Sequence, residues 1–228
     1  MNILLFGATG MVGQGVLREC LLDAGVTRVL AVGRSPTGQT HPKLRDLVLA
    51  DLGDCSSVEA DLSGFDACFF CLGVSSVGMK EEAYRRITYD LTLTIAQALV
   101  RLNSQMTFVY VSGAGTDSTE RGPRMWARVK GATENALMRL PFKAVYMFRP
   151  GFIQPMHRVR SKTALYQAIY VLATPIFALL SRRMPDRITT SERMGQAMVA
   201  VARHGAVRPL LEVADINALA AISRPENP

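Results

Sequence analysis

Three glycines near the start of the chain are spaced so that they could hold a diphosphate. Gly7, Gly10 and Gly13 directly follow the apolar run Ile3-Leu4-Leu5-Phe6 and stand where a helix would begin. Gly7 permits a tight turn, Gly10 lets backbone amides approach phosphates, and Gly13 lets the helix pack closely on its strand. The N–H groups and the dipole of a helix N-terminus favour an anion. This turn predicts a dinucleotide site, the alternative being a structural turn that binds nothing; the predicted lining is Gly7, Thr9, Gly10, Met11, Val12 and Gly13.

The residue that follows the second apolar run bears on which dinucleotide would bind. An NAD site usually has an acidic residue at the end of the second strand, where it holds the ribose hydroxyls. Here the run ends Ala31-Val32-Gly33-Arg34-Ser35, without an acid. A guanidinium can form paired hydrogen bonds with a 2′-phosphate. Arg34 therefore favours NADP over NAD, and the alternative interpretation is a solvated arginine on a turn.

Short apolar runs that alternate with helical stretches would position these residues. Continuous apolarity is typical of strands that are covered on both faces, which indicates a parallel sheet. Strand and helix in alternation predict right-handed crossovers and an α/β Rossmann fold, a doubly wound parallel sheet with helices on both faces. The predicted strands are 2–6, 28–32, 47–50, 67–71, 107–112 and 144–149, and the predicted helices are 12–24, 81–102, 126–139 and 191–204.

The domain organisation is simple. No repeat, low-complexity tract or long linker divides the 228 residues, so we expect one dinucleotide-binding domain over residues 1–228. After Pro150 the regular pattern loosens. Ligands bind at one edge of such a sheet, outside the carboxyl ends of the strands. Residues from about 151 to 190 are therefore predicted to form a small C-terminal lobe or lid on the substrate side.

The charge balance and the cysteines restrict the class of partner and the compartment. The net charge of +7 suits an anionic partner, but the basic groups lack the interleaved aromatic residues that stack on bases, so we expect no nucleic acid. Four irregularly spaced cysteines do not form a disulfide scaffold, and Met1 leads directly into an apolar run instead of a signal peptide. A cytoplasmic protein is the prediction. Cys68 and Cys71 should face opposite sides of a strand, so no metal site is expected.

The most apolar stretch after residue 150 is Leu165 to Leu180. It is too short, and with Pro175 inside it too broken, to span a bilayer. Its basic flanks and apolar centre fit three alternatives, which are a substrate lid or core segment, a protein contact such as a homodimer interface, and a peripheral membrane contact.

The chain resembles the short-chain dehydrogenase/reductase superfamily, specifically its atypical branch of NAD(P)H-binding, epimerase-like proteins. The resemblance covers most of the chain. Besides the glycine turn, the motifs that carry it are Asp51-Leu52, Cys71-Leu72-Gly73, Val109-Tyr110-Val111-Ser112, Val129-Lys130-Gly131-Ala132-Thr133-Glu134 and Phe148-Arg149-Pro150-Gly151. The resemblance implies that Asp51 and Leu52 lie beside the adenine and Leu72 and Gly73 beside the adjoining ribose. It also implies that Pro150, Gly151, Phe152 and Ile153 surround the nicotinamide.

The same resemblance implies a catalytic group of serine, tyrosine and lysine, in which the tyrosine exchanges a proton with the substrate oxygen. Ser112 and Lys130 match this pattern, and Lys130 would also hold the nicotinamide ribose, but Trp126 occupies the tyrosine position. An indole N–H is only a donor and cannot exchange a proton near neutral pH.

Two functions remain open. One is an NADP(H)-dependent oxidoreductase or epimerase-like enzyme acting on an unidentified small molecule, with another proton donor such as His157. The other is a catalytically silent NADP(H)-binding sensor or interaction protein.

Overall fold

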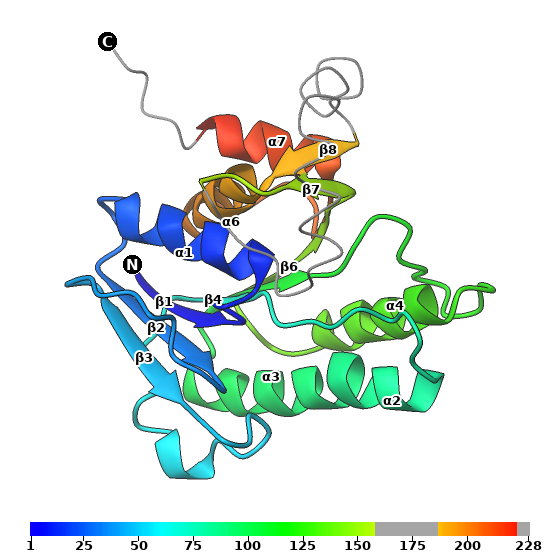
Figure 1. Ribbon diagram of the computed structural model, residues 1–228, viewed down its shortest axis with the longest axis horizontal. Helices are drawn as coiled ribbons and strands as arrows, with labels where there is room; N and C mark the ends of the chain where they lie inside the picture. The colour runs from blue at the N-terminus through cyan, green and yellow to red at the C-terminus, as the bar shows by residue number, and fades with distance from the viewer. Residues whose placement is uncertain (158–186, 223–228) are drawn as a thin grey trace.

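A seven-stranded parallel sheet forms the centre of the protein, with strand order β3-β2-β1-β4-β5-β6-β9. The computed structural model describes residues 1–157 and 187–222. Figure 1 shows helices on both faces of this sheet. The strands are β1 (Asn2–Phe6), β2 (Arg28–Gly33), β3 (Leu44–Val48), β4 (Ala67–Phe70), β5 (Thr107–Val111), β6 (Ala144–Arg149) and β9 (Leu210–Glu212). The predicted doubly wound α/β fold is confirmed.

Each face of the sheet is covered by its own set of helices (Figure 1). The first face carries α1 (Met11–Leu22), α6 (Ser191–His204) and α7 (Val213–Ile222). The opposite face carries α3 (Leu91–Leu102) and α4 (Met125–Leu137), with α2 (Glu81–Arg85) and a π-helical turn, Arg86–Asp90, leading into α3. The predicted helix over residues 81–102 therefore exists as one helical segment with a π-turn inside it.

Two apolar cores result from the alternation of side chains along the strands. Ile3 and Leu5 pack toward α1 and α6, whereas Leu4 and Phe6 pack toward α3. Cys68 belongs to the α3 side, and Cys71 contacts the core on the α1 side. The two thiols thus face opposite sides of the sheet, as their strand position predicts.

The third strand is shifted from its predicted position. The apolar run 47–50 was the sequence signal, but β3 pairs with β2 from Leu44 to Val48 and includes Arg45 and Asp46. β3 is an edge strand, and two of its five residues are exposed while the rest are only partly buried. An edge strand of this kind does not need a continuous apolar sequence. A prediction from hydrophobicity alone therefore put this strand at the wrong residues.

The C-terminal part contains three strands that no apolar run in the sequence predicted. β7 (Phe152–Gln154) pairs in parallel with β8 (Ile188–Thr190) in a separate two-stranded sheet. β9 extends the main sheet beside β6. Only the two ends of the predicted 151–190 lobe are described, and the apolar stretch Leu165 to Leu180 lies outside the described residues.

Candidate functional site

A trough runs along the carboxyl edge of the central strands. It consists of two cavities of about 400 and 530 Å³ that share Gly10, Cys71, Leu72 and Gly73. The first cavity extends to the end of β2, and the second extends to the ends of β5 and β6. The glycine turn and the loop after β4 therefore form the middle of one continuous site.

Steric contacts fix the glycine turn. Gly7 has a φ of +81°, and a Cβ atom there would lie 2.7 Å from the backbone of Cys71 and Leu72. A Cβ atom on Gly13 would lie 2.1 Å from the Gly7 carbonyl oxygen. Gly7 and Gly13 are thus needed for the turn itself, and Gly13 lines neither cavity among the described residues.

The N-terminus of α1 opens into the trough. Gly10 is its N-cap and supplies no side-chain hydrogen bond, and the first helical turn has no acidic residue. Thr9 and Gly10 line the first cavity, and Gly10, Met11 and Val12 line the second. An uncapped helix end with positive dipole fits a diphosphate, so the residues present suit a dinucleotide.

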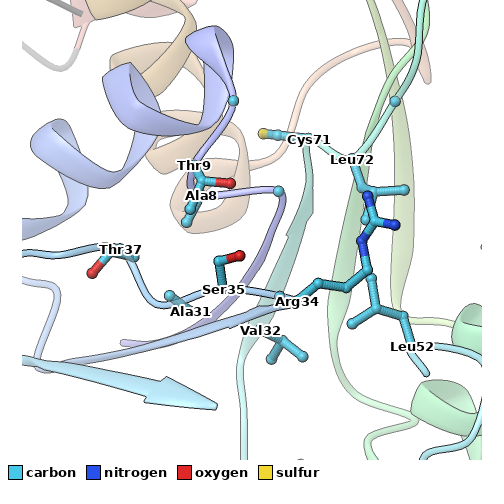
Figure 2. A pocket seen from close by; sticks show the side chains of 14 residues that line it. Ala8, Thr9, Ala31, Val32, Arg34, Ser35, Thr37, Leu52, Cys71 and Leu72 are labelled. Atoms are coloured by element: carbon cyan, nitrogen blue, oxygen red, sulfur yellow. The ribbon is translucent and has the colours of Figure 1, made fainter. Parts of the chain in front are cut away.

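Arg34 stands at the far end of the first cavity with Ser35 and Thr37. Figure 2 shows its side chain extending in the direction of Leu72. The side chain is exposed, and within the described chain no hydrogen bond or ion pair engages its guanidinium. The guanidinium is therefore available to an anionic group of a ligand.

An acidic residue does lie near this end, although the sequence directly after the second strand contains none. Asp46 on β3 pairs with Ala31 of β2. Its Oδ2 accepts hydrogen bonds from the Thr37 backbone N (3.1 Å) and from Thr37 Oγ1 (3.0 Å). Thr37 lines the cavity and Asp46 is not among its described lining residues. The predicted third strand began at residue 47 and so excluded Asp46. For this reason the sequence did not indicate an acid at this place.

The residues implied by the family resemblance divide into those that line the trough and those that do not. Leu52, Leu72 and Gly73 line the first cavity, and Pro150, Gly151 and Ile153 line the second. Asp51 Oδ1 instead accepts a hydrogen bond from the Gly53 N at 2.8 Å, in a turn. Neither Asp51 nor Phe152 is among the described lining residues.

Lys130 is the charged residue at the β5–β6 end. Its Nζ donates to the Ser112 carbonyl oxygen at 2.6 Å and lies 3.5 Å from that of Val111. Desolvation lowers the pKa of Lys130 to about 8, against the opposing influence of Glu134. The side chain is half-buried and lines the second cavity. Lys130 is therefore easier to deprotonate than an ordinary lysine.

Ser112 lines the same cavity, but its hydroxyl points elsewhere. Ser112 Oγ donates to Glu134 Oε1, and Arg149 Nε donates to the same carboxylate at 3.0 and 3.2 Å. Glu134 is completely buried, and the hydrogen bond with Glu134 raises the pKa of Arg149. The four-residue spacing of Lys130 and Glu134 places both on one face of α4, so the sequence could have indicated that Glu134 lies near Lys130. The ion pair with Arg149 joins two elements that are distant in sequence, and no local signal predicts it.

Trp126 lies one helical turn before Lys130 on α4. A Cβ atom on Gly115 would lie 3.8 Å from its Cη2, so the indole packs against the loop after β5. It is not among the described residues that line either cavity.

His157 is also outside the described lining, and its Nε2 lies 2.8 Å from Glu192 Oε2. The structure thus brings Lys130 and Ser112 to the trough, without Trp126 or His157.

Comparisons with known proteins agree with this geometry. The sequence matches the NAD(P)H-binding family over residues 7–140. It is 29% identical over 206 residues to "Protein fmp52-2, mitochondrial" of Aspergillus terreus, covering 87% of this chain and 85% of that protein. It is 31% identical over 155 residues to "Protein FMP52, mitochondrial" of Saccharomyces cerevisiae, covering 66% and 65%.

Solved structures share the fold. The dTDP-glucose 4,6-dehydratase DesIV of Streptomyces venezuelae, a double mutant with NAD and DAU bound, has a TM-score of 0.69 at 14% identity, covering 98% of this chain and 80% of that one. WbmF of Bordetella bronchiseptica in complex with NAD+ has a TM-score of 0.64 at 16% identity, covering 97% and 78%. The family match and this fold confirm the resemblance to atypical short-chain dehydrogenase/reductase proteins.

The relatives correct the predicted compartment. Both fungal proteins are named mitochondrial, which contradicts the prediction of a cytoplasmic protein. The free cysteines that supported that prediction respond to the redox state of a compartment and do not identify it. In the described part of the chain, no helix has the length and apolarity needed to cross a membrane.

Proposed function

Because this chain belongs to the NAD(P)H-binding family, we propose that it binds NADP(H) in the trough and acts on a small molecule as an oxidoreductase or epimerase-like enzyme. The observation that carries the proposal is the distribution of charge. Arg34 at one end and Lys130 at the other are the charged side chains among the described lining residues, and the uncapped N-terminus of α1 lies between them. The anionic groups of NADP(H) are its 2′-phosphate and its diphosphate, so Arg34 and the N-terminus of α1 complement them electrostatically, while Lys130 would donate hydrogen bonds to the neutral nicotinamide ribose.

Each part of the trough then has a role. The α1 amides hold the diphosphate, and Arg34 binds the 2′-phosphate. Thr37 donates two hydrogen bonds to the carboxylate of Asp46, which partly offsets its repulsion of this phosphate. Leu52, Leu72 and Gly73 contact the adenosine half. Lys130 holds the second ribose, and the loop from Pro150 to Ile153 borders the nicotinamide. When bound, the reduced dinucleotide supplies a hydride for a carbonyl group.

Arg34→Asp tests the choice of cofactor. The substitution should weaken NADPH binding by roughly 1–3 kcal/mol, the range of a charge-assisted hydrogen bond, because it removes the partner of the 2′-phosphate. NADH binding should change less. Arg139→Asp is the matched control, since Arg139 is exposed, lies on none of the described trough surface, and gives the same change in net charge. Calorimetry that shows equal affinities of the wild type for NADPH and NADH would contradict the NADP preference.

A catalytically silent NADP(H)-binding sensor is the second candidate, and two observations favour it. Trp126 replaces the proton-exchanging tyrosine, and Glu134 engages the hydroxyl of Ser112. The discriminating experiment incubates the protein with NADPH and a panel of aldehydes, ketones and quinones that includes 9,10-phenanthrenequinone.

The Trp126→Tyr variant makes this experiment decisive. Turnover by the wild type, slowed by the substitution, supports the enzyme. Binding of NADPH without turnover by the wild type, together with turnover gained by Trp126→Tyr, supports the sensor.

A further inference from the structure

We propose that Lys130 itself carries the proton exchanged with the substrate oxygen, so that the trough performs carbonyl chemistry without a tyrosine. This inference rests on the proposed oxidoreductase function. It assigns Lys130 a catalytic role in addition to holding the ribose.

The composition of the second cavity leaves few alternatives. Its described lining contains two titratable side chains, Lys130 and Cys71. Burial raises the pKa of the Cys71 thiol, so Cys71 keeps its proton at neutral pH. The hydroxyl of Ser112 donates to Glu134. Lys130 is therefore the described lining group that can both give and recover a proton near neutral pH.

The position of the Lys130 ammonium suits this task. Nζ donates to the Ser112 carbonyl oxygen at 2.6 Å, and a second N–H can reach the carbonyl oxygen of Val111 at 3.5 Å. An ammonium has three donors. Since no further hydrogen bond of Nζ occurs within the described residues, at least one N–H remains for a ligand in the cavity.

The surroundings of Lys130 keep its proton labile. Desolvation lowers its pKa to about 8. Glu134 on the same helix opposes this change, but Arg149 of β6 forms an ion pair with Glu134 and offsets its charge. The Tyr110 ring centroid lies 5.9 Å from Nζ, and burial raises the pKa of Tyr110, so this phenol stays neutral. Among the described residues, Glu134 is the carboxylate whose charge affects the pKa of Lys130.

The proton transfer balances with the proposed chemistry. In reduction, the carbonyl carbon would receive the hydride that a bound reduced dinucleotide supplies, and the C–O π electrons would move to the oxygen. That oxygen takes a proton from Nζ as an N–H bond breaks and an O–H bond forms. The neutral amine then recovers a proton from water at the mouth of the trough. The sum is carbonyl, NADPH and H⁺ giving alcohol and NADP⁺.

The first test needs no turnover. Reductive methylation of the wild type with formaldehyde and cyanoborohydride, followed across pH 6–11 by peptide mass spectrometry, reports when each lysine becomes a free amine. Lys130 should react with a midpoint near pH 8, with the exposed Lys143 as the internal reference. A midpoint for Lys130 near 10.4, the ordinary lysine value, overturns the proposal.

The second test separates catalysis from cofactor binding. Lys130→Arg keeps the positive charge, but a guanidinium does not release its proton in this pH range. With NADPH and 9,10-phenanthrenequinone, kcat should fall by on the order of 10²–10⁴-fold, while the NADPH affinity changes only a few-fold. The wild-type kcat should decline above pH 8, and the residual activity of the variant should not.

The outcomes distinguish this inference from the proposed function. If NADPH does not bind, the proposed function and this inference both fail. If NADPH binds and the quinone is reduced, but Lys130→Arg retains most of kcat with an unchanged pH profile, only the role of Lys130 is overturned. Circular dichroism and NADPH binding by the variant establish that it folds.

Discussion

The side chain of Glu134 carries a charge into an interior where none of its surface is exposed. Arg149 donates to its carboxylate from β6, and Ser112 Oγ donates to it from the end of β5. Glu134 thereby ties α4 to both strand ends that border the second cavity. Removing such an ion from water costs several kcal/mol, which the partner offsets only in good geometry. The ion pair therefore fixes the position of α4 beside the trough, and breaking it would be costly.

A double-mutant cycle measures the coupling free energy between Glu134 and Arg149. Glu134→Met and Arg149→Met should each destabilise the protein by roughly 3–5 kcal/mol, because each leaves the other charge buried without its partner. The double variant should cost less than the sum by on the order of 1–3 kcal/mol. Urea unfolding gives the free energies. Costs that add to within about 0.5 kcal/mol would show that the two residues are not energetically coupled.

Among the elements, α1 and α6 are held together through glycines. A Cβ atom on Gly195 of α6 would lie 2.7 Å from Glu19 Cβ on α1, and one on Gly15 would lie 2.5 Å from the Ser191 carbonyl oxygen. The helices therefore pack backbone to backbone. Since the N-terminus of α1 forms the proposed diphosphate site, this contact also sets the position of the trough.

Gly195→Ala tests this contact, because the sign of the change in the free energy of unfolding shows whether close packing or helix propensity dominates. Helix propensity alone would stabilise the protein by about 1 kcal/mol. Overpacking costs typically 1–3 kcal/mol, and a shift of α1 should also weaken NADPH binding. We expect a net loss in the free energy of unfolding together with a lower NADPH affinity by calorimetry. A gain in stability with unchanged affinity would mean that α1 and α6 separate freely.

The elements that the sequence predicted well are those whose environment is local or uniform. β1, β2, β4, β5 and β6 are covered on both faces, and their apolar runs predicted them to within one residue. Edge strand β3 has a polar-rich sequence, and β7 and β8 exist through pairing across a long stretch of chain. Hydrophobic periodicity carries no information about such partners.

The candidate site divides in the same way. The glycine turn was predictable because the tight turn and the adjacent helix start are local in sequence. The partners of Glu134 and Asp46 lie on other strands or loops, so their roles appear only once the sheet is assembled. The direction of the Ser112 hydroxyl likewise depends on a residue 22 positions away.

At the scale of the whole molecule, the trough joins segments that are far apart in the chain. It contains residues of the turn after β1, the loops after β2, β4, β5 and β6, and helix α4. A ligand that binds only the folded trough stabilises the entire domain through mass action. At a hundredfold excess over its dissociation constant, the stabilisation is about 2.7 kcal/mol. For a domain of this size, that corresponds to a rise in Tm of about 5–11 °C.

Two fragments of the dinucleotide should divide this stabilisation unequally. We expect 2′,5′-ADP to raise Tm by most of the NADPH effect, because its phosphates match Arg34 and the N-terminus of α1. Nicotinamide mononucleotide should raise it much less. Differential scanning fluorimetry at equal fragment concentrations, with Arg34→Asp as the variant and Arg139→Asp as the control, measures both. A larger stabilisation by nicotinamide mononucleotide than by 2′,5′-ADP would contradict this expectation. It would mean that the Lys130 end of the trough, and not the adenosine half, supplies most of the binding free energy.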